Sequence, residues 1–93
     1  MTPTKVKLLK AKNQVHFYYE DGKCLILDGA YLRSKSPSAE NKNNLLQSKN
    51  KFLNVKVVNI KKVGNYALRF IFDDDHKTGI YSWDYLVKIG NSN

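Results

Sequence analysis

The stretch from Val15 to Leu32, VHFYYEDGKCLILDGAYL, decides the fold of this chain. Its first five residues alternate, with valine, phenylalanine and tyrosine on one face, and a period of two is typical of a half-buried strand. The Asp21-Gly22 pair then favours a tight hairpin turn, because glycine adopts positive φ at little cost. A return strand over 24–27 follows, and Asp28 is suited to cap a short helical turn. The stretch therefore predicts a β-hairpin that runs directly into a helix.

A second stretch, LRFIFDDDHKTGIYSWDYL from Leu68 to Leu86, repeats this plan. Alternating apolar residues lead into an acidic turn, a return strand over 78–81 and a helix predicted from Trp83 to Ile89. Ser82 is the expected N-cap of that helix, and Gly90 is its expected C-terminal stop. The Tyr-Leu pair that ends the first stretch returns within this helix and ends the second stretch as well. The two stretches therefore indicate an internal duplication.

One further strand is predicted ahead of each unit. Val6 and Leu8 alternate with lysines, as in a guarded edge strand, and the β-branched run 55–63 predicts a longer strand. The predicted fold class is α+β: a small single domain over 1–93, with about six short β-strands in two related hairpin-helix units and a C-terminal helix. Between the units, residues 34–54 show no periodicity and are rich in Asn and Lys. We expect a mobile loop there, and the docking of a partner on it.

The composition is that of one globular domain. The chain has 93 residues, of which 42 % are hydrophobic and 26 % are charged. No apolar run approaches the roughly 20 residues of a membrane span, and the N-terminal residues do not form a signal peptide. The cytoplasm is therefore the expected compartment, without a membrane partner. The single cysteine, Cys24, lies in a predicted apolar strand, where we expect an inert packing role.

The net charge of +8 raises the possibility of a polyanionic partner, and the excess is concentrated in the central third of the chain. Lysine, however, outnumbers arginine fourteen to two. Specific nucleic-acid readers depend on arginine for bidentate contacts, and only Arg33 and Arg69 are present. The basic segment is therefore interpreted as a solvated surface, with nucleic-acid binding through it as the less favoured alternative.

The acidic turn is the densest group of residues able to bind a hard metal or transfer a proton. His76, Asp74 and Asp75 are candidate ligands for iron or another divalent ion, although a solvated hairpin turn explains the same residues. No serine, cysteine or threonine stands in a recognisable nucleophile motif, and the glycines do not form a phosphate-binding pattern. We therefore expect a protein that is not an enzyme and that needs no cofactor.

Four segments of the chain carry a family resemblance. The segments VGNYAL (63–68) and GIYSWDYL (79–86), with Leu32-Arg33 and SPSAE (36–40), closely resemble the gamma-butyrobetaine hydroxylase-like N-terminal domain family. The chain is most similar to its short stand-alone bacterial members, a domain of unknown function. The resemblance implies a small α+β domain that also occurs fused to carnitine-pathway dioxygenases and to P-loop ATPases carrying iron–sulfur clusters. In both fusions it is an accessory module and not the catalytic domain.

In the dioxygenase branch, the resemblance implies a zinc site of three cysteines and one histidine. The matching positions of this chain hold Ser36, Ser38, Asn41 and His76. Because a serine hydroxyl does not deprotonate readily enough to replace a thiolate, the zinc site is expected to be lost. The family turn also reads Asp-Gly-His, so Asp75 stands where a glycine is usual and must accept or avoid positive φ.

The expected function is that of a non-enzymatic accessory or protein-interaction module, linked by the resemblance to iron–sulfur or metal-dependent enzymes. The partner is expected to be another protein, and the sequence leaves its identity and the oligomeric state open. The candidate partner-binding residues stand at the start of the predicted loop: Arg33, Ser36, Ser38 and Glu40. A structural role is expected for Tyr31, Leu32, Trp83, Tyr85 and Leu86.

Overall fold

Each half of the chain forms one antiparallel three-stranded sheet and one helix. The computed structural model describes residues 2–37, 52–75 and 79–91. The elements in chain order are β1 (Lys5–Leu9), the 3-10 turn η1 (Lys10–Lys12), β2 (Gln14–Tyr18), β3 (Cys24–Asp28), α1 (Gly29–Ser34), β4 (Val57–Val63), β5 (Ala67–Phe72), β6 (Ile80–Ser82) and α2 (Trp83–Asn91). The sheets have the strand orders β1-β2-β3 and β4-β5-β6. This architecture confirms the predicted α+β fold.

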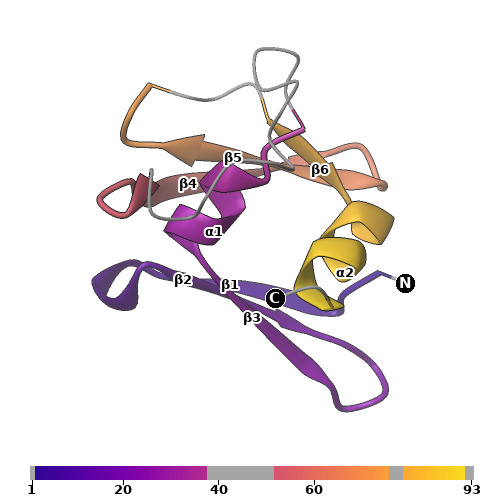
Figure 1. Ribbon diagram of the computed structural model, residues 1–93. Coiled ribbons are helices and arrows are strands. Elements are labelled where there is room, and N and C mark those ends of the chain that lie inside the picture. The colour runs from indigo at the N-terminus through magenta and orange to yellow at the C-terminus, as the bar shows by residue number, and fades with distance from the viewer. Residues whose placement is uncertain (1, 38–51, 76–78, 92–93) are drawn as a thin grey trace.

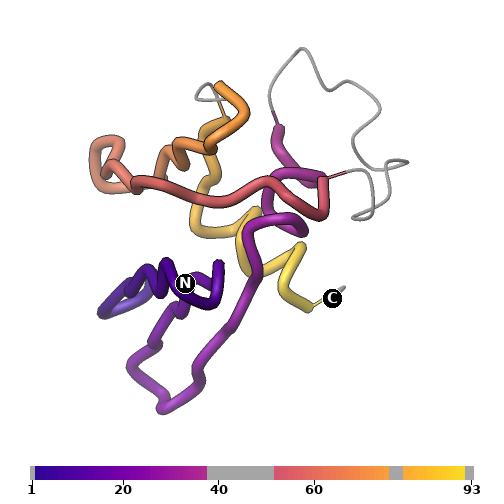
Figure 2. Tube along the Cα trace, turned by 90° about the vertical axis from the view of Figure 1, so that its left-hand side faces the viewer, coloured from indigo at the N-terminus to yellow at the C-terminus, as the bar shows by residue number. Residues whose placement is uncertain are grey.

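The two sheets face each other across one hydrophobic core, and the two helices lie between them (Figures 1 and 2). The alternation in the sequence sets which side chains face inward. Val15 and Phe17 of β2 and Phe70 and Phe72 of β5 are buried, whereas His16 and Arg69 point to the outer faces. At the centre of the core, the rings of Phe17 and Phe70 meet edge to face with their centroids 6.4 Å apart.

The internal duplication extends to individual hydrogen bonds. The backbone N–H of Tyr31 donates to the Asp28 carboxylate at 2.7 Å, and that of Tyr85 donates to the Ser82 hydroxyl at 3.1 Å. Both predicted N-caps are thus confirmed, and they hold the same position relative to the Tyr-Leu pair of their helix. The N–H of the first residue of each helix also donates to a corresponding carbonyl, from Gly29 to Asn13 and from Trp83 to Tyr66.

Two tyrosine hydroxyls connect the units reciprocally. Tyr31 of α1 donates to the carbonyl of Ile89 at 2.6 Å, and Tyr85 of α2 donates to the carbonyl of Lys35 at 2.5 Å. The two donors occupy equivalent places in their units, and so do the two acceptors, as an approximate two-fold axis between the units requires. Each unit therefore satisfies a backbone carbonyl at the end of the other unit's helix.

Two details of the sequence prediction were wrong. Gly90 does not end the C-terminal helix, which continues to Asn91. A Cβ at Gly90 would lie 2.5 Å from Leu25 Cδ1, so the glycine permits close packing of α2 on β3. Cys24 is exposed and does not pack inside, because it pairs with Tyr18 on the outer face of the first sheet.

The other predicted elements agree with the structure within a few residues. Asp75 adopts the left-handed conformation with a φ of 67°, and so takes the conformation usual for glycine at this place. The centre of the predicted mobile loop, 38–51, lies outside the described residues, and its mobility stays a prediction. No helix in the described parts of the chain is long and apolar enough to cross a membrane.

The core tyrosines predict an alkaline limit to stability. Burial raises the pKa of Tyr19, Tyr31 and Tyr81 above the ordinary value of 10.0. The unfolded chain then releases these protons at a lower pH than the folded chain, so the free energy of unfolding should fall as the pH rises above 10. Urea denaturation between pH 8 and 11.5 measures this, with tyrosinate absorbance recorded in parallel. A stability that stays constant over this range would contradict the prediction.

Candidate functional site at the C-terminal end of α1

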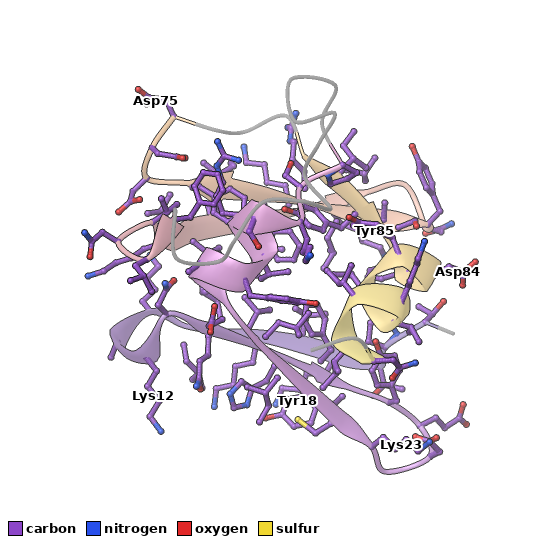
Figure 3. The ribbon with its side chains drawn as sticks, viewed as in Figure 1. Lys12, Tyr18, Lys23, Asp75, Asp84 and Tyr85 are labelled. Carbon is purple, nitrogen blue, oxygen red and sulfur yellow. The ribbon has the colours of Figure 1, made fainter. Side chains whose placement is uncertain are left out.

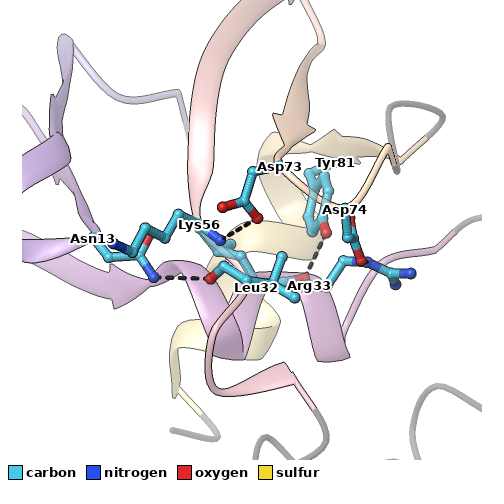
Figure 4. Close-up of polar contacts among 8 residues, drawn as sticks. Asn13, Leu32, Arg33, Lys56, Asp73, Asp74 and Tyr81 are labelled. Atoms are coloured by element: carbon cyan, nitrogen blue, oxygen red, sulfur yellow. Dashed lines mark hydrogen bonds and ion pairs between the residues drawn. The ribbon is translucent and has the colours of Figure 1, made fainter.

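The last turn of α1 places Arg33 against the acidic turn after β5. Arg33 Nε lies 2.8 Å from Asp74 Oδ2 (Figure 4). The guanidinium carbon lies 4.5 Å from the centroid of the Phe52 ring. The Arg33 side chain is only 12 % exposed. An ion pair on one side and aromatic stacking on another therefore hold the guanidinium in one orientation.

One nitrogen of this fixed guanidinium is unsatisfied. Arg33 Nη1 is buried and has no hydrogen-bond partner among the described residues. A guanidinium carries five N–H donors in a rigid fork, so an oriented arginine with an unused nitrogen is suited to bind a further acceptor. The site therefore holds an unused donor for a carboxylate or carbonyl oxygen, which an incoming group can reach only when the atoms that cover Nη1 move.

A buried hydrogen-bond chain supports the end of α1 beneath Arg33. The Tyr81 hydroxyl donates to the carbonyl of Leu32 at 2.5 Å, and the side chain of Ser36, itself fully buried, is hydrogen-bonded to Tyr81. Burial raises the pKa of Tyr81 well above its usual range, whereas the bond to Ser36 acts in the opposite direction. The hydroxyl consequently keeps its proton and remains a donor at neutral pH.

The acidic turn makes contacts within the protein. Asp73 accepts the backbone N–H of Lys56 at 2.9 Å and donates its own N–H to the Lys56 carbonyl, which fixes the turn to the start of β4. The carboxylate of Asp74 contacts Arg33, and Asp75 is exposed (Figure 3).

His76 lies outside the described residues. Within residues 2–37, 52–75 and 79–91, no three His, Cys, Asp or Glu side chains are grouped as a metal site. Metal binding through His76, Asp74 and Asp75 thus stays a prediction.

Of the positions that the resemblance matches to zinc ligands, the structure describes only Ser36, and the loss of the zinc site stays a prediction. Ser36 occupies the first of these positions, and its side chain is fully buried and bonded to Tyr81. A neutral hydroxyl engaged in this way offers no charge to a zinc ion. Ser38 and Asn41 lie outside the described residues, as does the partner-binding candidate Glu40.

The predicted structural residues divide into two groups. Tyr31, Leu32 and Leu86 are buried in the core, whereas Trp83 and Tyr85 are half-buried and pack against it. Sequence reasoning missed the contact of Phe52 with Arg33, because the segment that holds Phe52 is mostly polar and shows no periodicity. The pairing of Arg33 with Asp74 was missed as well, since the two residues are 41 positions apart.

The family of the chain follows from its sequence as a whole. The model of the family described as gamma-butyrobetaine hydroxylase-like, N-terminal, matches residues 6–87. The chain belongs to this family. The matched region includes both hairpin-helix units, with Arg33, Ser36 and the acidic turn.

Solved structures of similar proteins share the fold of this gamma-butyrobetaine hydroxylase-like domain. One is the crystal structure of a protein of unknown function of the DUF971 family from Acidithiobacillus ferrooxidans, with a TM-score of 0.81 and 28 % identity, covering 96 % of this chain and 92 % of that one. Two solution structures determined by NMR have TM-scores of 0.78 and 0.77 and identities of 35 % and 34 %; the alignments cover 97 % and 98 % of this chain and 73 % and 70 % of the others. A comparison with curated proteins gives no match.

Proposed function

We propose that this chain is a non-enzymatic, cytoplasmic accessory module that binds another protein through the C-terminal end of α1. The proposal includes a link to iron–sulfur or metal-dependent enzymes, which rests on the family resemblance alone. The observation that carries the binding role is the fixed guanidinium of Arg33, with its unsatisfied Nη1.

An arginine held in this way is a good anchor for a protein partner. Arginine and aromatic residues are enriched among the residues that dominate binding energy at interfaces. Because Asp74 and Phe52 already orient the guanidinium, a partner that supplies an acceptor to it loses little side-chain entropy on binding.

The surroundings of Arg33 add apolar area to this anchor. Leu53, which directly follows the stacked Phe52, is 59 % exposed. An oriented cation, with an exposed leucine next in sequence to the residue that stacks on it, fits a partner surface that presents a carboxylate or carbonyl oxygen together with an apolar side chain.

Two other functions remain as alternatives. The first is binding of iron or another divalent ion by His76 with Asp74 and Asp75. The second is nucleic-acid binding through the Lys-rich central segment, whose residues Lys42, Lys49 and Lys51 lie outside the described part of the chain. Neither has a contact or an unsatisfied group in the described residues that favours it over protein binding.

Co-purification from native cytoplasm, followed by mass spectrometry and titration of the captured partner, tests the proposal. Arg33→Gln should weaken partner binding by about tenfold or more, because it removes the anchoring cation. Arg69→Gln is the matched control, since Arg69 is the other arginine of the chain and lies exposed on β5. It should leave the affinity unchanged.

The same titration separates the alternatives. Loss of binding only when Lys42, Lys49 and Lys51 are neutralised, with a steep salt dependence, would favour a polyanionic partner. Loss of binding after chelation and in His76→Ala, with Arg33→Gln unaffected, would favour the metal site. Equal affinities for Arg33→Gln and Arg69→Gln would contradict the role assigned to Arg33.

A further inference from the structure

A pocket of about 430 Å³ opens between the end of the β2–β3 hairpin and α2. Tyr19 and residues 23–25 line it from the hairpin, and Asp84, Val87 and Asn91 line it from the helix. Figure 1 shows the hairpin extending past α2, and Figure 3 shows Lys23 and Asp84 on these two elements. The pocket has the size, and the mainly apolar wall with a few polar groups, that small-ligand sites commonly have.

The internal duplication explains why this pocket is open. Val87 directly follows the Tyr-Leu pair of α2, so it holds the position that Arg33 holds after the Tyr-Leu pair of α1. In the Arg33 unit, a long side chain reaches the acidic turn and pairs with Asp74. On the α2 side, the short Val87 side chain cannot span the corresponding distance to the β2–β3 turn. The pocket is therefore the counterpart of the Arg33 site, without the arginine.

One residue of the pocket wall, Tyr19, carries an unsatisfied hydroxyl. Tyr19 is only 8 % exposed, and its hydroxyl is buried without a hydrogen-bond partner among the described residues. Phe72, at the equivalent place directly before the second acidic turn, has no such hydroxyl, so packing alone does not require one. Burial also raises the pKa of Tyr19, so the hydroxyl stays protonated and able to donate at neutral pH.

The charges around the pocket define what this hydroxyl can bind. Lys23 lines the hairpin side, and its ammonium group has no ion-pair partner in the described parts of the chain. Asp84 lines the helix side and repels an anionic group there, so a negative charge on a ligand is favoured only on the hairpin side, near Lys23. Leu25 and Val87 supply apolar lining. The wall of the pocket thus combines one cation, one carboxylate, one tyrosine with an unsatisfied hydroxyl, and apolar side chains.

We propose that this pocket binds a monocarboxylate at the end of an apolar chain, with the carboxylate accepting from Tyr19 Oη and facing Lys23 Nζ. The apolar body lies against Leu25 and Val87. Two sources supply this chemistry: a free small carboxylic acid, or the C-terminal apolar residue of a polypeptide. The site is distinct from Arg33, so it does not depend on the protein-binding function proposed above.

An NMR titration of the full chain tests this site, with amide shifts followed by residue. Hexanoate and a short peptide ending in a free leucine carboxylate are the two probes, and their carboxamides are the matched controls. At least one acid should shift the amides of Tyr19, Lys23, Leu25 and Val87 in a saturable way, with a Kd of about 1 mM. Its carboxamide should bind about tenfold more weakly. Hexanoate binding indicates a free acid, and peptide binding alone indicates a chain terminus.

Three variants separate the carboxylate contacts from general packing. Tyr19→Phe and Lys23→Gln should each weaken the binding acid severalfold, whereas Lys12→Gln, at the other end of the sheet (Figure 3), should not change it. Tyr19→Phe should keep or raise the urea midpoint, because it removes an unsatisfied buried hydroxyl. Equal binding of acid and carboxamide, equal affinities for all three variants, or the absence of saturable shifts at these amides would each overturn the proposal.

Discussion

Gly29→Ala should lower the free energy of unfolding by about 3 kcal/mol or more, a large part of the stability of a domain this small. A Cβ at Gly29 would overlap the Asn13 side chain, lying 2.7 Å from Asn13 Cγ. Because α1 begins at this glycine, the added methyl must displace either the helix or the asparagine.

The asparagine cannot move without losing several contacts. Asn13 Nδ2 donates to the carbonyl of Val55 at 3.0 Å, and Asn13 Oδ1 accepts the N–H of Val57 at 3.1 Å. Its own carbonyl accepts the N–H of Gly29 at 2.8 Å. The side chain thus connects the first hairpin to the start of β4, and its displacement leaves part-buried backbone groups unsatisfied.

Urea denaturation of three variants measures this effect. Gly22→Ala is the control for adding a methyl group to a glycine, because no atom lies within 4 Å of the added Cβ. Since Gly22 has a φ of 89°, this variant should lose about 1 kcal/mol of the free energy of unfolding. The double variant Gly29→Ala/Asn13→Gly should lose less free energy of unfolding than the two single variants together. The reason is that Asn13→Gly removes the side chain that the added methyl group would meet. Equal losses for Gly29→Ala and Gly22→Ala, or strict additivity in the double variant, would show that this contact is unimportant.

Tyr81→Phe should lower the free energy of unfolding by about 2 kcal/mol or more, although the substitution removes only one oxygen atom. The Tyr81 side chain is fully buried, and its ring packs edge to face on Phe70 with the centroids 4.8 Å apart, a contact that phenylalanine can keep. Stability is lost because the carbonyl of Leu32 and the side chain of Ser36 no longer have this hydroxyl as a hydrogen-bond partner.

A double-mutant cycle with Ser36→Ala separates the hydrogen bonds from packing. In the Tyr81→Phe variant the Ser36 hydroxyl has already lost this partner. Ser36→Ala should therefore lower the free energy of unfolding less in that variant than in the wild type. Tyr66→Phe is the control, since Tyr66 is 60 % exposed and should change the stability by less than about 0.5 kcal/mol. An unchanged urea midpoint for Tyr81→Phe would refute the assigned role of the hydroxyl.

The local features of the fold were predictable because they depend on neighbouring residues. The Asp21-Gly22 turn, the caps at Asp28 and Ser82 and the alternation around Phe17 and Phe70 are patterns of a few positions, and each appears in the structure where it was expected. The repeat of the same pattern also predicted the two-unit architecture.

Contacts between distant segments were not predictable in the same way. Gly90 was taken as a helix stop because no local pattern shows that Leu25 packs against it. Cys24 was assigned to the wrong face, because an apolar run such as CLIL does not show which of its residues face inward. The joining of Arg33 to Asp74 likewise depends on how the two units pack, so one site appeared in the sequence as two separate candidates.

The exchange of tyrosine hydroxyls between the units has a consequence for the order of events during synthesis. The carbonyl of Lys35 follows the first helix and is translated early, whereas its donor, Tyr85, is translated 50 residues later. Tyr31, in turn, is translated long before Ile89, whose carbonyl accepts its hydrogen bond. On the ribosome, the first hairpin and its helix therefore lack these partners until α2 has emerged from the exit tunnel, and the two tyrosine hydrogen bonds can form only after that point.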